Sequence, residues 1–274
     1  MTQRSGYGEV ERAVKASEYG QILSANVRYD KYRHPSVSPE EWVALLGRDV
    51  SNMEHMPLTR GIAQIFIRHS QQYQPELLEP NDEFVLPLAG SIHDIGEAIA
   101  TDKSYGDKTS EDEAKEIVEF DKALDIVFAE EYPPHFQAAK DIVFDHKGLT
   151  ERGKKFFAIE CLGYMRTAMN AMDHVLYGTC TPEQIAGLQW LYTDVVTNMT
   201  VKMIKQAEHF DATRTALIAN IERIDTAHGL ITLNPDVFKN YAYKGENEPA
   251  RMKRESEIAS EAWREFRESI LVAN

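Results

Sequence analysis

The residues best suited to chemistry form a short ionisable run in an otherwise small and apolar part of the sequence. Four such side chains fall within residues 88–102: His93, Asp94, Glu97 and Asp102. Residues three and four apart share one face of a helix, so Glu97 would lie beneath both His93 and Asp94. Asp102 is five residues past Glu97, in a sequence typical of a loop. The pattern predicts a metal-binding helix that ends in an acidic loop.

The apolar segment before this run, residues 84–89, is predicted to be buried. Burial of an imidazole and a carboxylate without a partner costs roughly several kilocalories per mole. A solvated surface pair is therefore a poorer interpretation of His93 and Asp94 than a pair satisfied by a metal ion or another partner.

The run from His93 to Asp102 resembles the signature of the HD-domain metal-dependent phosphohydrolases. That signature is a His, then a His-Asp pair, then a distant Asp, and the spacing His-Asp-x-x-Glu-x-x-x-x-Asp is most similar to the branch that contains the 5'-deoxynucleotidases. The resemblance spans about residues 50–178. It implies that Glu97 and Asp102 belong to an active site.

The resemblance places the first metal-binding histidine at His55, which follows an acid in the pair Glu54-His55. The residues from Ser51 to Glu54 match a capping box and predict a helix start. His69, near the other end of the same helix, is the alternative. Its gap to His93 would be cramped, because it must hold a helix end, a polar loop and most of the next helix.

Asp173 is the fourth expected ligand, on a helix predicted from Lys154 to Gly178. It falls within that helix's apolar stripe, where a carboxylate needs a partner, and its position resembles that of the family's last Asp. Asp145 is the alternative, although Asp-His-Lys-Gly is typical of a turn with a solvated acid.

Two imidazoles and two carboxylates suit a divalent ion, and affinity alone does not choose among Mn, Co, Fe, Mg and Zn. Such an ion lowers the pKa of bound water from about 15.7 to roughly 7, which supplies a hydroxide for phosphomonoester hydrolysis. Glu97 would orient or deprotonate that water or support a ligand, and Asp102 would act as general acid or bind a sugar hydroxyl. Arg48 and Arg60 are candidates to bind the phosphate, with a surface salt bridge as the alternative for each.

The sequence thus predicts a metal-dependent phosphohydrolase acting on a small phosphorylated substrate, a (deoxy)nucleoside 5'-monophosphate being favoured. Walker, G-x-G-x-x-G, G-x-S-x-G and His-Glu-x-x-His motifs are absent from the sequence. Two alternatives stay open. One is an HD-type di-iron oxygenase, which would need His135 and His146 as further ligands. The other is a non-enzymatic metal- or nucleotide-binding module.

Composition limits the partners and the compartment. The 274 residues include 30 basic and 44 acidic side chains, a net charge of −14 that opposes binding to nucleic acids and anionic membranes. The two cysteines, Cys161 and Cys180, lack metal-site spacing and are expected to be reduced. The first residues do not resemble a signal peptide and no stretch is apolar enough to span a membrane, so a cytoplasmic protein is expected.

Helical periodicity with no strand pattern predicts an all-α fold, an HD-type helical bundle with additional N- and C-terminal helices. We expect a single domain over residues 1–274, with a core at about 50–210 and an extension at about 211–274. The family resemblance implies a homodimer. A C-terminal apolar stripe that a single domain would leave uncovered supports the same prediction: Trp263, Phe266, Ile270 and Leu271.

Overall fold

The computed structural model describes residues 4–47, 51–98, 109–128, 135–145 and 148–273. Within these ranges the chain is helical or irregular, apart from an isolated antiparallel bridge between Val27 and Ser51. The predicted all-α fold is confirmed. None of the helices described is both long and apolar enough to cross a membrane.

The chain forms two compact units. Unit 1 contains residues 1–28 and 47–159, and unit 2 contains residues 29–46 and 160–274. The boundary expected near residue 211 does not coincide with this division. Residues 160–210 belong with the C-terminal helices because α9 (Pro182–His209) packs on α10 (Asp211–Ala219) and on α12 (Glu248–Ala273).

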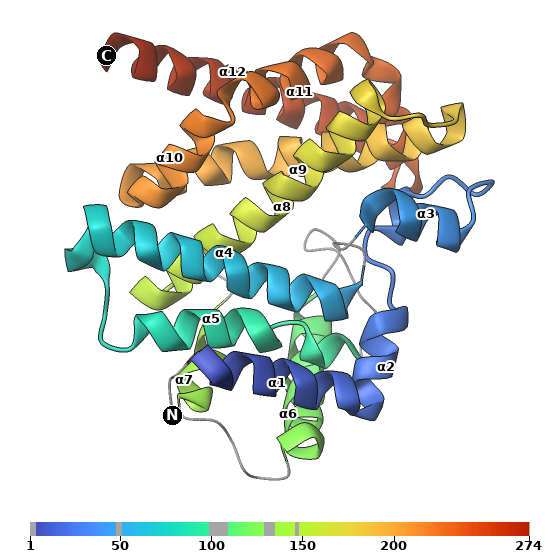
Figure 1. Ribbon diagram of the computed structural model, residues 1–274. Coiled ribbons are helices and arrows are strands. Elements are labelled where there is room, and N and C mark those ends of the chain that lie inside the picture. Colours follow the sequence, from blue (N-terminus) through green and yellow to red (C-terminus); the bar gives the residue numbers. More distant parts are fainter. Residues whose placement is uncertain (1–3, 48–50, 99–108, 129–134, 146–147, 274) are drawn as a thin grey trace. The chain divides into compact units, whose positions relative to one another are not determined.

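Unit 1 is organised around α5 (Asp82–Ile92), which Figure 1 shows lying alongside α4 (Asn52–Tyr73). The apolar segment expected to be buried is indeed core, since Val85, Leu86 and Leu88 are almost fully buried. The other elements of the unit are α1 (Arg4–Ala16), α2 (Glu18–Ala25), η3 (Pro75–Leu77), η4 (Ile95–Ala98), α6 (Ser110–Phe128), α7 (Phe136–Val143) and the first part of α8 (Glu151–Tyr177).

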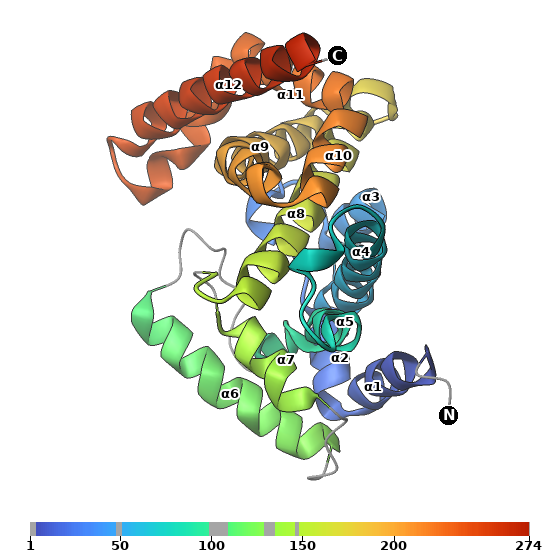
Figure 2. The ribbon, with the colours of Figure 1, turned by 90° about the vertical axis from the view of Figure 1, so that its left-hand side faces the viewer.

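Aromatic contacts join α6 to α7, and Figure 2 shows the two helices side by side. The ring centroids of Phe120 and Phe144 lie 4.9 Å apart, and those of Phe128 and Phe136 lie 5.5 Å apart. Because α6 also packs on η4, it covers the segment that follows the His-Asp pair.

Helix starts follow the local signals in the sequence. The Ser51 hydroxyl accepts a hydrogen bond from the Glu54 amide at 3.3 Å, as an N-cap should. A separate helix, α2, begins directly after α1 because the Ser17 side chain caps it and accepts from the Gly20 amide at 3.2 Å.

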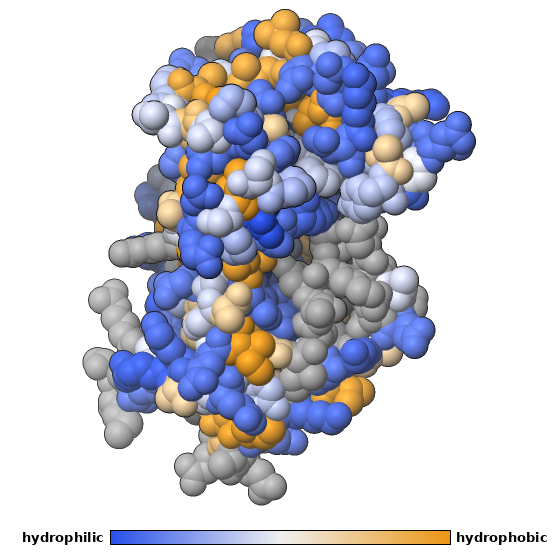
Figure 3. All heavy atoms as spheres, turned by 90° about the vertical axis from the view of Figure 1, so that its right-hand side faces the viewer, coloured by the Kyte–Doolittle hydropathy of each residue, from blue (hydrophilic) through white to orange (hydrophobic). Residues whose placement is uncertain are grey.

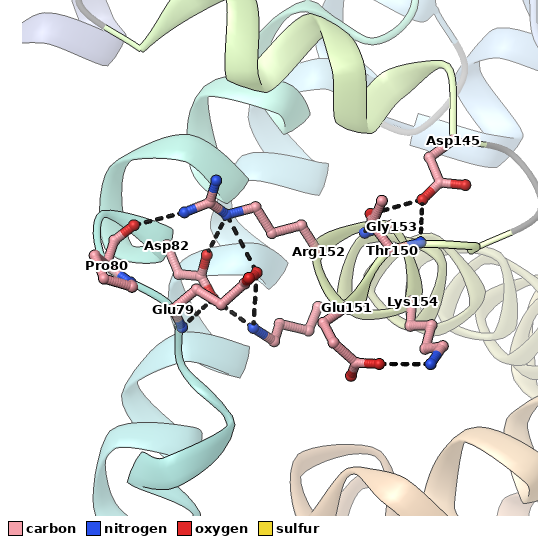
Figure 4. A network of polar contacts seen from close by, with 10 residues as sticks. Glu79, Pro80, Asp82, Asp145, Thr150, Glu151, Arg152, Gly153 and Lys154 are labelled. Carbon is pink, nitrogen blue, oxygen red and sulfur yellow. Dashed lines mark hydrogen bonds and ion pairs between the residues drawn. The ribbon is translucent and has the colours of Figure 1, made fainter.

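A buried ion-pair network joins the starts of α5 and α8 (Figure 4). The Asp82 carboxylate accepts from Lys155 Nζ at 2.6 Å and from Arg152 Nε at 2.8 Å. The side chains of Asp82 and Lys155 are each only 1% exposed. Arg152 also donates to the Pro80 carbonyl at 2.5 Å, so the turn before α5 is fixed to α8.

Unit 2 is built on α9, which contacts elements from both of its chain segments. Its remaining elements are η1 (Asp30–Tyr32), α3 (Pro39–Leu46), the rest of α8, α11 (Ile221–Leu233) and η5 (Pro235–Lys244). A side chain at Gly187 would come within 2.7 Å of the Tyr32 carbonyl and 3.1 Å of the Trp42 ring, so this glycine permits a close approach. The Asp194 carboxylate accepts from the hydroxyls of both Tyr32 and Tyr241. These contacts attach residues 29–46 to α9.

The C-terminal apolar stripe is mostly covered within unit 2. Trp263 and Ile270 are buried, whereas Leu271 is 64% exposed. On the face drawn in Figure 3, hydrophilic residues predominate and hydrophobic ones lie in small separated groups. The stripe therefore no longer argues for a dimer, and the homodimer stays a prediction from the resemblance alone.

His228 on α11 is a buried histidine of unit 2 that lies between two hydroxyls. Its Nε2 is 3.3 Å from Thr200 Oγ1 and its Nδ1 is 2.9 Å from Ser260 Oγ. Because the Thr200 hydroxyl donates to the Val196 carbonyl at 2.7 Å, its oxygen accepts from His228 Nε2, and Ser260 then donates to Nδ1. Burial lowers the pKa of His228 from 6.5 to about 4, and nearby Asp225 offsets this only in part.

The buried imidazole predicts acid-sensitive stability. Below pH 6.5 the unfolded chain binds a proton that the folded chain binds only near pH 4. The stability that neutral His228 contributes to the folded state is therefore fully present above about pH 6.5 and is lost as the pH falls toward 4. From the size of the shift, roughly 3 kcal/mol should be lost over that window. Urea unfolding followed by tryptophan fluorescence would measure it, because all three tryptophans belong to unit 2.

His228→Asn should flatten this dependence, whereas His209→Asn, a change at an exposed histidine of α9, should leave it unchanged. If the stability of His228→Asn fell just as steeply between pH 6.5 and pH 4, the acid sensitivity would belong to another group.

Candidate metal centre

Three of the four predicted metal ligands come together in unit 1. His55, His93 and Asp94 are all buried, and one candidate ligand atom from each lies within 4.8 Å of the others. They come from α4 and from the end of α5, the two helices that pack most closely in the unit. The structure thus supports the prediction of a His/Asp cluster that could bind a metal.

His55 lies in the first turn of α4, directly after the Ser51 cap. Its Nε2 is 3.2 Å from the Thr59 hydroxyl, one turn further along. His69, the rival candidate, lies near the other end of α4, where its ring contacts Tyr73 at a centroid distance of 4.6 Å. Of the two histidines, the cluster contains His55.

His93 follows the last residue of α5 and is oriented through both ring nitrogens. Its Nδ1 lies 3.0 Å from the Gly90 carbonyl, to which it donates, so Nε2 faces Asp94 Oδ1 at 3.2 Å. A backbone bond of this kind fixes the ring of a metal-binding histidine. The rings of His55 and His93 lie 5.2 Å apart, centroid to centroid.

Gly90 lets α4 and α5 approach closely enough for this contact. A Cβ at that position would lie 2.7 Å from the Arg60 amide nitrogen on α4. Any other residue here would therefore force the backbone to shift. Gly90 therefore has a packing role.

The helix predicted to carry His93, Asp94 and Glu97 ends earlier than expected. α5 stops at Ile92, and a 3₁₀ segment, η4, follows over Ile95–Ala98. Gly96 weakens helix continuation, and the Glu97 carbonyl accepts from Asn26 Nδ2 at 3.0 Å. His93 and Asp94 consequently lie at a helix end rather than within a long helix.

Glu97 is buried beside the cluster but is not one of its three members. Its Oε2 accepts from Asn52 Nδ2 at 2.5 Å, and Asn52 precedes His55 by three residues on α4. Sequence reasoning missed Asn52, although an asparagine next to a helix cap and near a candidate ligand is a usable signal. Asp102, the other predicted catalytic residue, lies outside the described residues.

Arg28 is a second residue that the sequence did not single out. Its Nη1 lies 2.5 Å from Asp94 Oδ2, and both side chains are more than nine-tenths buried. The only sequence signal is an arginine in the polar and aromatic connector that begins at Asn26.

One of the two arginines predicted to bind phosphate, Arg60, has a partner outside the cluster. Arg60 forms an ion pair with Glu11 on α1, with 2.5 Å between Nε and Oε1, which matches the salt-bridge alternative. Arg48 lies outside the described part of the chain, as does His146. His135 is exposed at the start of α7 and stacks on Phe84, with 6.0 Å between ring centroids.

Asp173 has a different setting from the one expected. It belongs to unit 2, is 39% exposed and accepts from Arg223 Nη2 at 2.5 Å. The apolar stripe of α8 ends at Met172, because Leu176 and Tyr177 are exposed. The structure therefore gives this carboxylate an arginine partner.

Asp145 forms a turn before α8, as its sequence predicts. Its carboxylate accepts from the backbone amides of Leu149 and Thr150, each at 2.8 Å, and Figure 4 shows it beside Thr150. These contacts give it a structural role.

No protein-family model, no curated protein and no solved structure matches this chain. The likeness to the HD-domain family therefore rests on the residues of the cluster and their spacing.

The donor set suits a divalent first-row ion. Two imidazoles and one carboxylate provide mixed nitrogen and oxygen ligands. Two ligands on such an ion lie at most about 4.2 Å apart, so separations of up to 4.8 Å require only small side-chain adjustments. Three protein ligands with further positions open to water or substrate are typical of catalytic rather than structural metal sites.

Proposed function

We propose that the protein is a metal-dependent phosphohydrolase that releases phosphate from a small phosphorylated substrate. The observation that carries this proposal is the buried cluster of His55, His93 and Asp94. Its support from the sequence is the spacing that continues to Glu97 and Asp102. By the same resemblance, the favoured substrate class is the deoxynucleoside 5'-monophosphates.

Each residue has a defined part in this proposal. His55, His93 and Asp94 would hold the divalent ion, which when bound polarises a phosphoryl oxygen and makes water acidic enough to attack at neutral pH. Glu97, which is held by Asn52 at 2.5 Å, would accept the proton of the attacking water. Asp102 would donate a proton to the leaving group.

Phosphate release provides the test. The purified protein, loaded with Mn²⁺ or Co²⁺, should release phosphate from deoxynucleoside 5'-monophosphates, and removal of the metal with a chelator should abolish the release. His93→Ala should lose both bound metal and activity, because the ring supplies a ligand. Metal content by mass spectrometry and phosphate by a colorimetric assay are the two measurements.

His69→Ala is the matched control, since His69 is on the same helix as His55 but outside the cluster. It should keep both metal and activity. Stoichiometric metal in His93→Ala would show that the ion is bound elsewhere.

A further inference from the structure

The two oxygens of Asp94 face different groups. Oδ2 accepts from Arg28 Nη1 at 2.5 Å, and Oδ1 lies 3.2 Å from His93 Nε2. The Arg28 and Asp94 side chains are only 8% and 9% exposed, so water screens their attraction weakly. A candidate metal ligand is thus already neutralised by a buried cation of the protein itself.

The backbone on either side holds Arg28 at this place. Its neighbour Val27 forms the antiparallel bridge to Ser51, the cap of the helix that carries His55. Asn26 donates to the Glu97 carbonyl at 3.0 Å. The segment is therefore tied to both elements that flank the cluster, and the guanidinium is a built part of the site.

We propose that Arg28 competes with the metal ion for Asp94 and thereby sets the metal affinity of the site. This inference rests on the proposed function only in assuming that the cluster binds a divalent ion. A guanidinium and a divalent ion on one carboxylate repel each other in a poorly screened interior. The ion must therefore displace the guanidinium or bind against its charge.

The alternative role for Arg28 is to orient Asp94. The two roles predict opposite changes in metal affinity when Arg28 is replaced. A positioning residue around a metal site raises metal affinity, and its loss typically costs about 10- to 100-fold. A competitor lowers metal affinity, so its loss should raise it. The stability of the metal-free protein should fall when Arg28 is replaced, because Asp94 would lose this counter-ion.

Calorimetric titration of the metal-free protein with Co²⁺ tests the proposal. Arg28→Met should bind Co²⁺ on the order of 10- to 100-fold more tightly than the wild type, since a repulsive charge is removed. Its metal-free melting temperature should fall by roughly 5 °C, and Co²⁺ should raise that temperature by more than in the wild type. Arg28→Lys, which keeps the charge, should bind Co²⁺ with nearly wild-type affinity. If Arg28→Met fails to fold, Arg28→Gln provides the same test, because it also removes the charge and leaves a polar side chain at this position.

Arg251→Met is the matched control, because it removes an exposed arginine that pairs with Glu248 and Glu255 on α12. It should leave the Co²⁺ affinity unchanged. Equal or weaker Co²⁺ binding in both Arg28→Met and Arg28→Gln would overturn the competition, even if the wild type hydrolyses phosphomonoesters. The predicted order of affinities without any phosphate release would support the competition and overturn the proposed function. Absence of Co²⁺ binding in every variant would overturn both.

Discussion

Glu97→Gln is expected to retain the bound metal while losing phosphate release by roughly 10²- to 10⁴-fold, the usual contribution of general acid or base catalysis. The amide is nearly isosteric with the carboxylate and can still accept from Asn52, whose Nδ2 lies 2.5 Å from Glu97 Oε2. What it cannot do is take a proton. The rate of phosphate release from the Mn²⁺-loaded protein, compared with its metal content, would measure the loss.

Two comparisons make this result specific. Glu76→Gln changes an exposed acid in η3 and should leave both metal and rate unchanged. Asn52→Ala should lower the rate without altering the number of ionisable groups, because it leaves Glu97 without this donor. Full activity in Glu97→Gln would remove this residue from the mechanism, whatever its metal content.

The cluster could be predicted because short stretches of the sequence around each residue carry the signal. A His-Asp pair after an apolar segment needs a partner, and a histidine after a strong helix cap was the natural companion. The structure brings His55 to His93 and Asp94, as expected. Local patterns suffice here because α4 and α5 are neighbours in sequence and pack directly on each other.

The arginine partners could not be predicted in the same way, because pairing partners are far apart in sequence. Arg28 meets Asp94 across 66 residues, and Arg60 meets Glu11 across 49. Charge and spacing alone do not separate a phosphate-binding arginine from one in an ion pair. Asp173 illustrates the same limit, since its partner Arg223 is 50 residues away.

Helix positions followed from caps and periodicity, whereas the division into units did not. The helix start predicted from the Ser51 to Glu54 capping box agrees with the structure, where α4 begins at Asn52. The assignment of residues 29–46 to unit 2 depends on long-range contacts, including the hydrogen bond from the Tyr32 hydroxyl to Asp194. Helical periodicity carries no information about such contacts.

Asp82→Asn is expected to destabilise the protein by about 3–5 kcal/mol, the usual cost of breaking a buried ion pair on one side. Lys155 Nζ would lose its carboxylate at 2.6 Å and keep the longer ion pair with the more exposed Glu79 at 3.8 Å. Urea unfolding followed by far-ultraviolet circular dichroism is the suitable measurement, because unit 1 contains no tryptophan. The network also fixes the start of α8, where Phe156 contacts the His93 ring at a centroid distance of 6.0 Å. Metal affinity should therefore fall together with stability.

Two further variants distinguish a buried pair from a general sensitivity of this region. Asp82→Leu combined with Lys155→Met removes both charges and should recover much of the loss, since no buried charge is left unpaired. Lys154→Met removes the neighbouring exposed pair with Glu151, whose side chains are 43% and 58% exposed, and should change stability by less than about 1 kcal/mol. A double variant as unstable as Asp82→Asn would mean that shape and hydrogen bonding, rather than the unpaired charge, determine the cost. The stability of unit 1 would then depend on the turn before α5, which Arg152 holds through the Pro80 carbonyl.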